Sequence, residues 1–232
     1  LNNSKNIYEL KNGTGFIKEY DNNGNLLFEG EYKNGKRFGL GKEFYYYNSK
    51  LKFEGEYLNG ERNGKGKEYY LNGKFSESYY LNGERNGIGK DYDDKGNLEF
   101  EGLYLYGKQR KGKAYIDGEL EYEGDYLFDR KYNGKGYDKN GNIIYYLKDG
   151  NGDVIEYYFN NKLKYNGKYK DGKKDGNCKE YDINGNLLFN GEYLYGKKWY
   201  GKLYDLNNNN YELIKGKGFI KELDDEGILQ FE

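Results

Sequence analysis

Apolar and acidic residues alternate in the stretch Phe-Glu-Gly-Glu-Tyr at residues 53–57. In a β-strand this spacing places the apolar and the acidic positions on opposite faces of a sheet. Asn59-Gly60 and Asn63-Gly64 tolerate positive φ, so they predict a reversal of the chain. Residues 66–70 then predict a returning strand, and Asn72-Gly73 predicts a second reversal. The pattern therefore indicates a two-stranded hairpin of about 23 residues.

The same unit recurs along the whole chain. Its Gly-X-Tyr element ends, in successive copies, at Tyr32, Tyr57, Tyr104, Tyr126, Tyr169 and Tyr193, and Tyr80 closes a degenerate copy. The aromatic residue of the returning strand recurs at Tyr20, Phe44, Tyr69, Tyr92, Tyr115, Tyr137, Tyr157, Tyr181 and Tyr204, and Leu223 takes its place last. Self-similarity at a fixed period is the mark of a repeat architecture. We therefore expect about ten units over residues 1–232, forming one domain.

The expected fold is all-β, an elongated single-layer antiparallel meander of these two-stranded repeats. No segment keeps the apolar spacing of a helix, and glycine falls every few residues. The absence of proline suits an uninterrupted hydrogen-bonded ladder, although a skewed overall composition explains it equally well. Residues 138–164 match the pattern least, and we expect displaced or bulged strands there. Within them, residues 147–152 resemble residues 10–15.

Composition favours an ordered single sheet over disorder. Charged residues make up 33% of the chain, which favours disorder, but aromatic residues make up 19% and the repeat is regular. Tyrosine has an apolar body and a polar tip, so it suits a half-exposed surface. We expect Phe53, Gly55 and Tyr57 to stack with their copies on one face, with the glycine leaving room for a neighbouring ring. Tyr106 is expected on an exposed loop.

The residue types argue against catalysis. The chain has no histidine, which removes the commonest general base and metal ligand and the usual zinc site. Carboxylates recur once per unit, which is typical of a face and not of a single site. The only cysteine, Cys178, is expected to be a structural thiol. We therefore expect no enzymatic activity, no cofactor and no metal.

The Phe-Glu-Gly-Glu-Tyr element, the glycine-rich loop and the following Gly-X-Gly resemble the MORN repeat (membrane occupation and recognition nexus). Residues 53–66 match best, residues 28–41 match well and residues 165–176 match in part. The chain lacks the histidine that often precedes the loop glycine and adds a second Asn-Gly turn, which is similar to the divergent bacterial branch. The resemblance implies elongated antiparallel sheets that act as scaffolds, dimerise, bind partner helices or touch membrane lipids.

Two functions fit these features. The first is a non-catalytic scaffold for a protein partner, which would bind the seven tyrosines of the Gly-X-Tyr element: Tyr32, Tyr57, Tyr80, Tyr104, Tyr126, Tyr169 and Tyr193. The alternative is a module that binds an anionic membrane surface through loop cations: Lys36, Arg37, Lys108, Arg110, Lys111, Lys197 and Lys198. The net charge of −1 and the acidic neighbours of these cations argue against nucleic acid as a partner.

The ends of the array predict self-association. A meander has two edge strands with unpaired backbone groups, and neither Phe16–Tyr20 nor Ile228–Phe231 contains proline. The last unit stops in mid-pattern, so we expect a homodimer, a head-to-tail fibre or continuation of the array in a longer protein. No apolar run is long enough to span a membrane. A cytoplasmic location is slightly favoured, and secretion or the cell surface stays open if an N-terminal signal was removed.

Overall fold

The computed structural model describes residues 10–205, 209–218, 222–223 and 229–231, and these residues form β-strands and turns without a helix. The all-β prediction is therefore confirmed for the described part of the chain. Ile228, the first residue of the predicted edge segment Ile228–Phe231, lies outside the described residues.

The chain divides into two units, residues 1–108 and 109–232. The strands of the first unit are β1 (Gly15–Tyr20), β2 (Leu26–Lys33), β3 (Lys36–Phe44), β4 (Leu51–Leu58), β5 (Glu61–Tyr69), β6 (Phe75–Leu81), β7 (Glu84–Tyr92) and β8 (Leu98–Leu105). Those of the second are β9 (Lys108–Ile116), β10 (Glu119–Leu127), β11 (Arg130–Tyr137), β12 (Ile143–Leu147), β13 (Gly152–Tyr157), β14 (Leu163–Lys170), β15 (Lys173–Tyr181), β16 (Leu187–Leu194), β17 (Lys197–Tyr204), β18 (Asn210–Ile214), β19 (Glu222–Leu223) and β20 (Leu229–Phe231).

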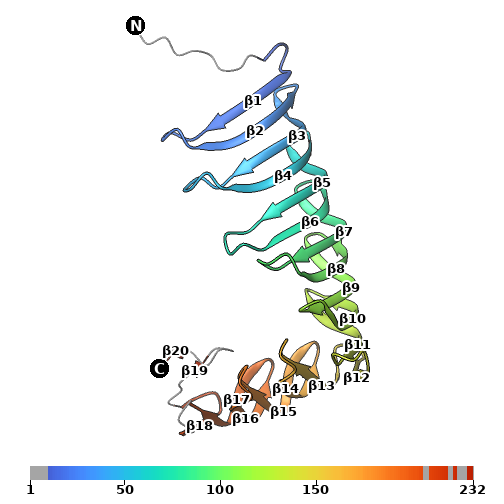
Figure 1. Ribbon diagram of the computed structural model, residues 1–232, viewed down its shortest axis with the longest axis vertical. Helices are drawn as coiled ribbons and strands as arrows, with labels where there is room; N and C mark the ends of the chain where they lie inside the picture. The colour runs from blue at the N-terminus through green and yellow to red at the C-terminus, as the bar shows by residue number, and fades with distance from the viewer. Residues whose placement is uncertain (1–9, 206–208, 219–221, 224–228, 232) are drawn as a thin grey trace. The chain divides into compact units, whose positions relative to one another are not determined.

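Within each unit, consecutive strands pair antiparallel, so the order in the sheet follows the order in the sequence (Figure 1). Within the first unit this order runs through β1–β8, and within the second it runs through β9–β12, then in a separate sheet through β13–β18, with β19 and β20 as a further pair. The predicted meander is confirmed with one correction. The ladder ends at β12 and a new one starts at β13, inside the stretch 138–164 where the sequence predicts irregular strands.

Two kinds of turn close the hairpins. In the first, both central residues have positive φ, as in Asn59 (54°) and Gly60 (98°), a backbone that follows the twist of the flanking strands. The amide of Gly60 also donates to the carbonyl of Arg37 in the preceding repeat at 3.0 Å. In the second, Asp93 accepts hydrogen bonds from the backbone and side-chain amides of Asn97. The same pair recurs as Asp21–Asn25, Asp138–Asn142, Asp182–Asn186 and Asp205–Asn209.

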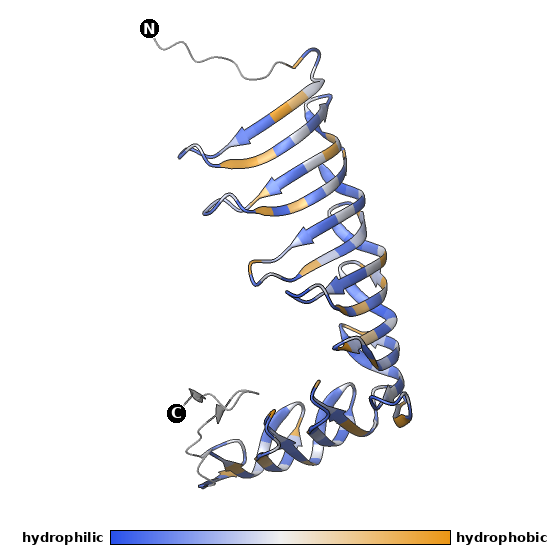
Figure 2. Cartoon of the chain, in the orientation of Figure 1, coloured by the Kyte–Doolittle hydropathy of each residue, from blue (hydrophilic) through white to orange (hydrophobic). Residues whose placement is uncertain are grey.

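Hydrophobic and hydrophilic residues alternate along the strands (Figure 2). The buried residues share one side of the sheet, the packed face, and the charged residues between them lie on the other side, the outer face. On the packed face Phe53 is 0% exposed, and its ring meets that of Tyr80 in the next repeat at 5.1 Å. A Cβ atom on Gly55 would stand 2.8 Å from the ring of Phe53 and 2.7 Å from the Cα of Gly66. Glycine is needed because any side chain would occupy the place of the ring, which confirms the expectation from the sequence.

Replacing Tyr57 by alanine should lower the free energy of unfolding by about 2–4 kcal/mol. Its ring is 3% exposed and packs edge-on against Phe28 and Phe53. The matched control is Tyr106→Ala, because Tyr106 is 71% exposed, and this change should cost less than about 1 kcal/mol. Urea denaturation followed by circular dichroism measures both, and equal losses would show that the packed face is wrongly assigned.

Candidate functional site

A ladder of ion pairs, the inner ladder, runs through the packed face. The guanidinium of Arg62 lies 4.0 Å from the centre of the Phe53 ring and pairs with Glu43 at 2.7 Å and Glu68 at 2.9 Å. The hydroxyl of Tyr57 donates to Glu43 at 2.8 Å. Because Glu43 belongs to β3 and Glu68 to β5, one cation joins neighbouring repeats.

The inner ladder recurs with the cation at an equivalent place, the second residue after a turn. Its further pairs are Arg37 with Glu19, Arg85 with Asp91, Lys131 with Glu121 and Glu156, and Lys174 and Lys198 with Glu180. At Gln109 the cation is absent, and Ala114 stands before the closing aromatic residue, where Glu43, Glu68 and Asp91 stand in the preceding repeats. Gly136 and Leu203 also stand in place of this carboxylate, and in those repeats Lys131 and Lys198 pair with carboxylates of other strands.

The electrostatics of Glu43 show how strongly the inner ladder holds its charges. Burial alone would raise the pKa of Glu43, but the hydrogen bonds and positive charge of Arg62, with the hydroxyl of Tyr57, lower it below its ordinary value of 4.5. Glu19 and Glu180 have lowered pKa values through their own cations, again against the effect of burial. The carboxylates are thus held ionised inside the packed face.

The predicted partner-binding tyrosines belong to this inner ladder. Five of the seven are buried, with exposed fractions of 3–8%, namely Tyr57, Tyr80, Tyr104, Tyr126 and Tyr193. Tyr32 and Tyr169 are half-buried and donate to Glu19 and Glu156. A partner-binding role for these residues stays a prediction, but most of their rings offer almost no surface to a partner.

The predicted lipid-binding cations separate into two groups. Arg37 and Lys198 are half-buried members of the inner ladder, so the sequence interpretation of them as loop cations misses their role. The signal was present, because the cation recurs at one position in successive repeats. Exposed side chains are found at the other five positions, Lys36, Lys108, Arg110, Lys111 and Lys197.

The outer face of the first unit carries an alternating line of charges, the charged row. Its residues lie opposite one another on β1 to β8 in the order Lys18, Glu29, Lys42, Glu54, Lys67, Glu77, Lys90 and Glu101. Lys18 pairs with Glu29 at 2.9 Å, and Lys67 pairs with Glu77 at 3.2 Å. The row follows from the strand register, which brings together charges that are far apart in the sequence.

A second line, the mixed row, runs beside it across the same strands. From β1 to β8 it contains Phe16, Glu31, Leu40, Glu56, Lys65, Tyr79, Ile88 and Leu103. Leu40, Ile88 and Phe16 are 64%, 59% and 54% exposed. Two shallow hollows of about 480 and 440 Å³ lie between the rows and share Glu54 in their lining. The outer face therefore offers a hollow with one charged and one largely apolar wall.

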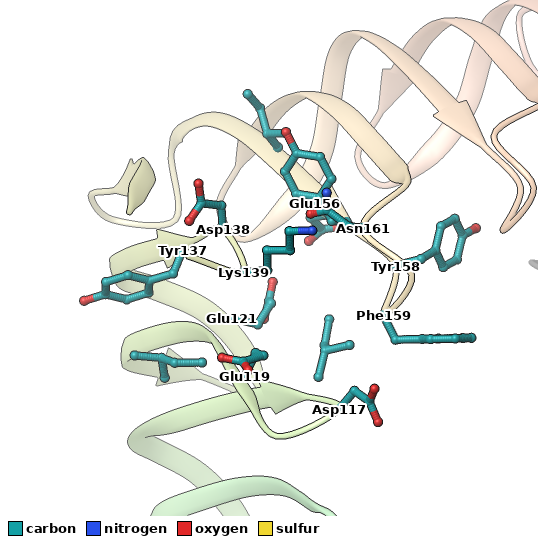
Figure 3. Close-up of a pocket in the computed structure, with 14 residues that line it drawn as sticks. Asp117, Glu119, Glu121, Tyr137, Asp138, Lys139, Glu156, Tyr158, Phe159 and Asn161 are labelled. Atoms are coloured by element: carbon teal, nitrogen blue, oxygen red, sulfur yellow. The ribbon is translucent and has the colours of Figure 1, made fainter. Parts of the chain in front are cut away.

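A cavity of about 220 Å³ in the second unit is lined by residues of the turns and strand ends of β9–β10, β11–β12 and β13–β14. Figure 3 shows Glu121, Lys139 and Glu156 gathered in it, with the ring of Tyr137 turned away. Such a lining can receive a small polar group. Glu121 and Glu156 both pair with Lys131, so they are not placed as a free acid and base.

Lys131 connects the two ladders of the second unit. Its ammonium pairs with Glu121 of β10 and lies 3.4 Å from the hydroxyl of Tyr145 on β12 and 3.6 Å from Glu156 on β13. Burial alone would lower the pKa of Lys131, but the charges of Glu121 and Glu156 raise it well above its ordinary value. The cation therefore stays charged where one ladder ends and the next begins.

Comparisons with known proteins assign no family. No family model matches the sequence, and no curated protein matches it significantly, so the resemblance to MORN repeats rests on the repeat residues alone. Among the described residues, no cluster of carboxylates and cysteine is arranged to hold a metal ion. In the same part of the chain no helix has the length and apolarity to cross a membrane.

The inner ladder predicts a loss of stability in acid. Since the pKa of Glu43 is lowered in the folded state, its contribution is fully present above its ordinary value and is lost as the pH falls below it. The free energy of unfolding should therefore decline between about pH 5 and pH 3. In Arg62→Gln the decline should be shallower, because Glu43 then keeps its burial without its cation. Urea denaturation across this range measures the slope, and Lys67→Gln, which alters only the outer face, should keep the wild-type slope.

Removing the Lys131 ammonium should destabilise the second unit. Lys131→Met leaves Glu121 and Glu156 without their shared cation, at a cost on the order of 3 kcal/mol. The control Lys139→Met changes an exposed lysine of the same cavity and should cost less than about 0.5 kcal/mol. Trp199, the only tryptophan, lies on β17, so its fluorescence during urea denaturation reports on this unit. Wild-type stability in Lys131→Met would contradict the assignment.

Proposed function

We propose that this protein is a non-catalytic repeat scaffold that binds a protein partner through the outer face of its first unit. The observation that carries the proposal is the mixed row, in which Phe16, Leu40 and Ile88 are more than half exposed on one face of one ladder. Apolar side chains gathered on a surface and bordered by charges are typical of an interaction site.

The construction of the first unit supports a rigid binding surface. Turn amides link successive repeats, as Gly60 does to Arg37 and Gly83 to Arg62, at 3.0 and 2.9 Å. The inner ladder joins the same repeats through side chains. A surface held in this way loses little conformational freedom on binding, so more of its contact energy is available for affinity. The charged row then supplies specificity through the sign of each position.

The other functions considered have less support. The cavity of the second unit contains carboxylates, but Glu121 and Glu156 share Lys131, which suits a structural role better than acid–base catalysis. The anionic-lipid alternative has less support because two of its seven cations, Arg37 and Lys198, already pair with glutamates in the inner ladder. A protein partner is the ligand that best fits the two hollows, because it can contact both the charged row and the largely apolar mixed row.

The proposal predicts that charges placed in the mixed row abolish partner binding. The wild-type chain and Ile88→Lys/Leu103→Lys are immobilised and exposed to a lysate of the source cells, and bound proteins are quantified by mass spectrometry. At least one protein should be retained by the wild type and reduced about tenfold or more by the variant, a loss of about 1.4 kcal/mol or more.

The matched control is Tyr46→Lys/Tyr106→Lys. Both tyrosines are strongly exposed, at 67% and 71%, and both lie in turns outside the mixed row. The control should retain the same proteins as the wild type. Equal retention by all three chains would contradict a role for the outer face.

A further inference from the structure

We propose that the occupant of the outer face is a second copy of the same chain, packed outer face to outer face about a two-fold axis parallel to the strands. The inference rests on the proposed function, because it assigns the partner of the same surface. It follows from the order of residues in the charged row and the mixed row, all of which lie within the first unit.

The charged row is complementary to itself in this arrangement. A two-fold axis between β4 and β5 places β1 on β8, β2 on β7, β3 on β6 and β4 on β5 of the other copy. Lysines occupy odd strands and glutamates even strands, so every lysine then faces a glutamate. The facing pairs are Lys18–Glu101, Glu29–Lys90, Lys42–Glu77 and Glu54–Lys67, each formed twice.

The mixed row fits the same axis. Phe16 faces Leu103 and Leu40 faces Tyr79, so apolar side chains meet, while Glu56 faces Lys65 with opposite charge. Glu31 opposite Ile88 is the only position without a match. Apolar contact and opposite charge therefore coincide in one arrangement, although the two rows have different residue orders.

Other arrangements of the two faces are less favourable. An axis perpendicular to the strands would place each strand on itself and bring Glu29 against Glu31 and Lys67 against Lys65. A shift of the two copies by two strands keeps the charged row matched but leaves two strands of each copy uncovered, with either Ile88 and Leu103 or Phe16 and Glu31 exposed. Only the axis between β4 and β5 covers all eight strands. Aligned sheets pack face to face at about 10 Å.

Charge reversal tests the arrangement on the full chain. Lys42→Glu brings two carboxylates together at both places where Lys42 faces Glu77, and Glu77→Lys brings two ammonium groups together there. Each variant alone should raise the dissociation constant of the dimer at least about tenfold. An equimolar mixture should restore dimerisation, because each variant then faces its complement. Light scattering across about a hundredfold range of concentration measures the mass, and circular dichroism confirms that both variants are folded.

The control mixture combines Lys42→Glu with Glu54→Lys. It makes the same change of charge on a strand of the same face, but Glu54 faces Lys67 in the proposed dimer, so mixing should not restore association. Restoration by Glu54→Lys in place of Glu77→Lys would overturn the proposed axis. A wild-type chain that is monomeric throughout, or dimers that tolerate both single variants, would overturn the self-pairing. If the chain does not pair with itself but still retains lysate proteins that are lost in Ile88→Lys/Leu103→Lys, the scaffold function is supported and the outer face binds a different protein.

Discussion

The structure depends on burying a large ring within a single layer of sheet. A second layer normally covers the apolar face of a sheet, but here Phe53 is covered by its own repeat and by its neighbours. Glycines at residues 55 and 66 bring the backbone against the ring, and the guanidinium of Arg62 lies 4.0 Å above it. Glycine, aromatic ring and cation therefore act together to bury the ring.

This device explains why the molecule separates its charges into two sets. The inner ladder holds carboxylates and cations in pairs because an unpaired charge inside the packed face would be costly. The charged row on the outer face meets water, where each pair contributes little to stability. Charges that fold the protein and charges that are available to a partner thus lie on opposite sides of the same strands.

Strand pairing is interrupted between β12 and β13, but the turn and side-chain contacts that link successive repeats are kept there. The hairpin at Asp149-Gly150 has positive φ at both residues, and the amide of Gly150 donates to the carbonyl of Tyr132 at 2.8 Å. Lys131 supplies the side-chain link across the same point. This explains why residues 147–152 resemble residues 10–15. Residues 10–15 lead into β1, the first strand of its sheet, and residues 147–152 lead into β13, which is also a first strand.

The sequence by itself determined the β class, the repeat, the two faces and the site of irregularity, because strand alternation and turn chemistry are local properties. The recurrence of the loop cations is visible in the sequence, but only the tertiary structure showed that they point inward. The register shifts between Gly55 and Tyr57, so that Tyr57 stands opposite Arg62, and this bulge turns the cation over the ring. The charged row and the cavity also required the structure. Both are set by which strands lie side by side and in what register, and that is decided by packing between repeats and not within one.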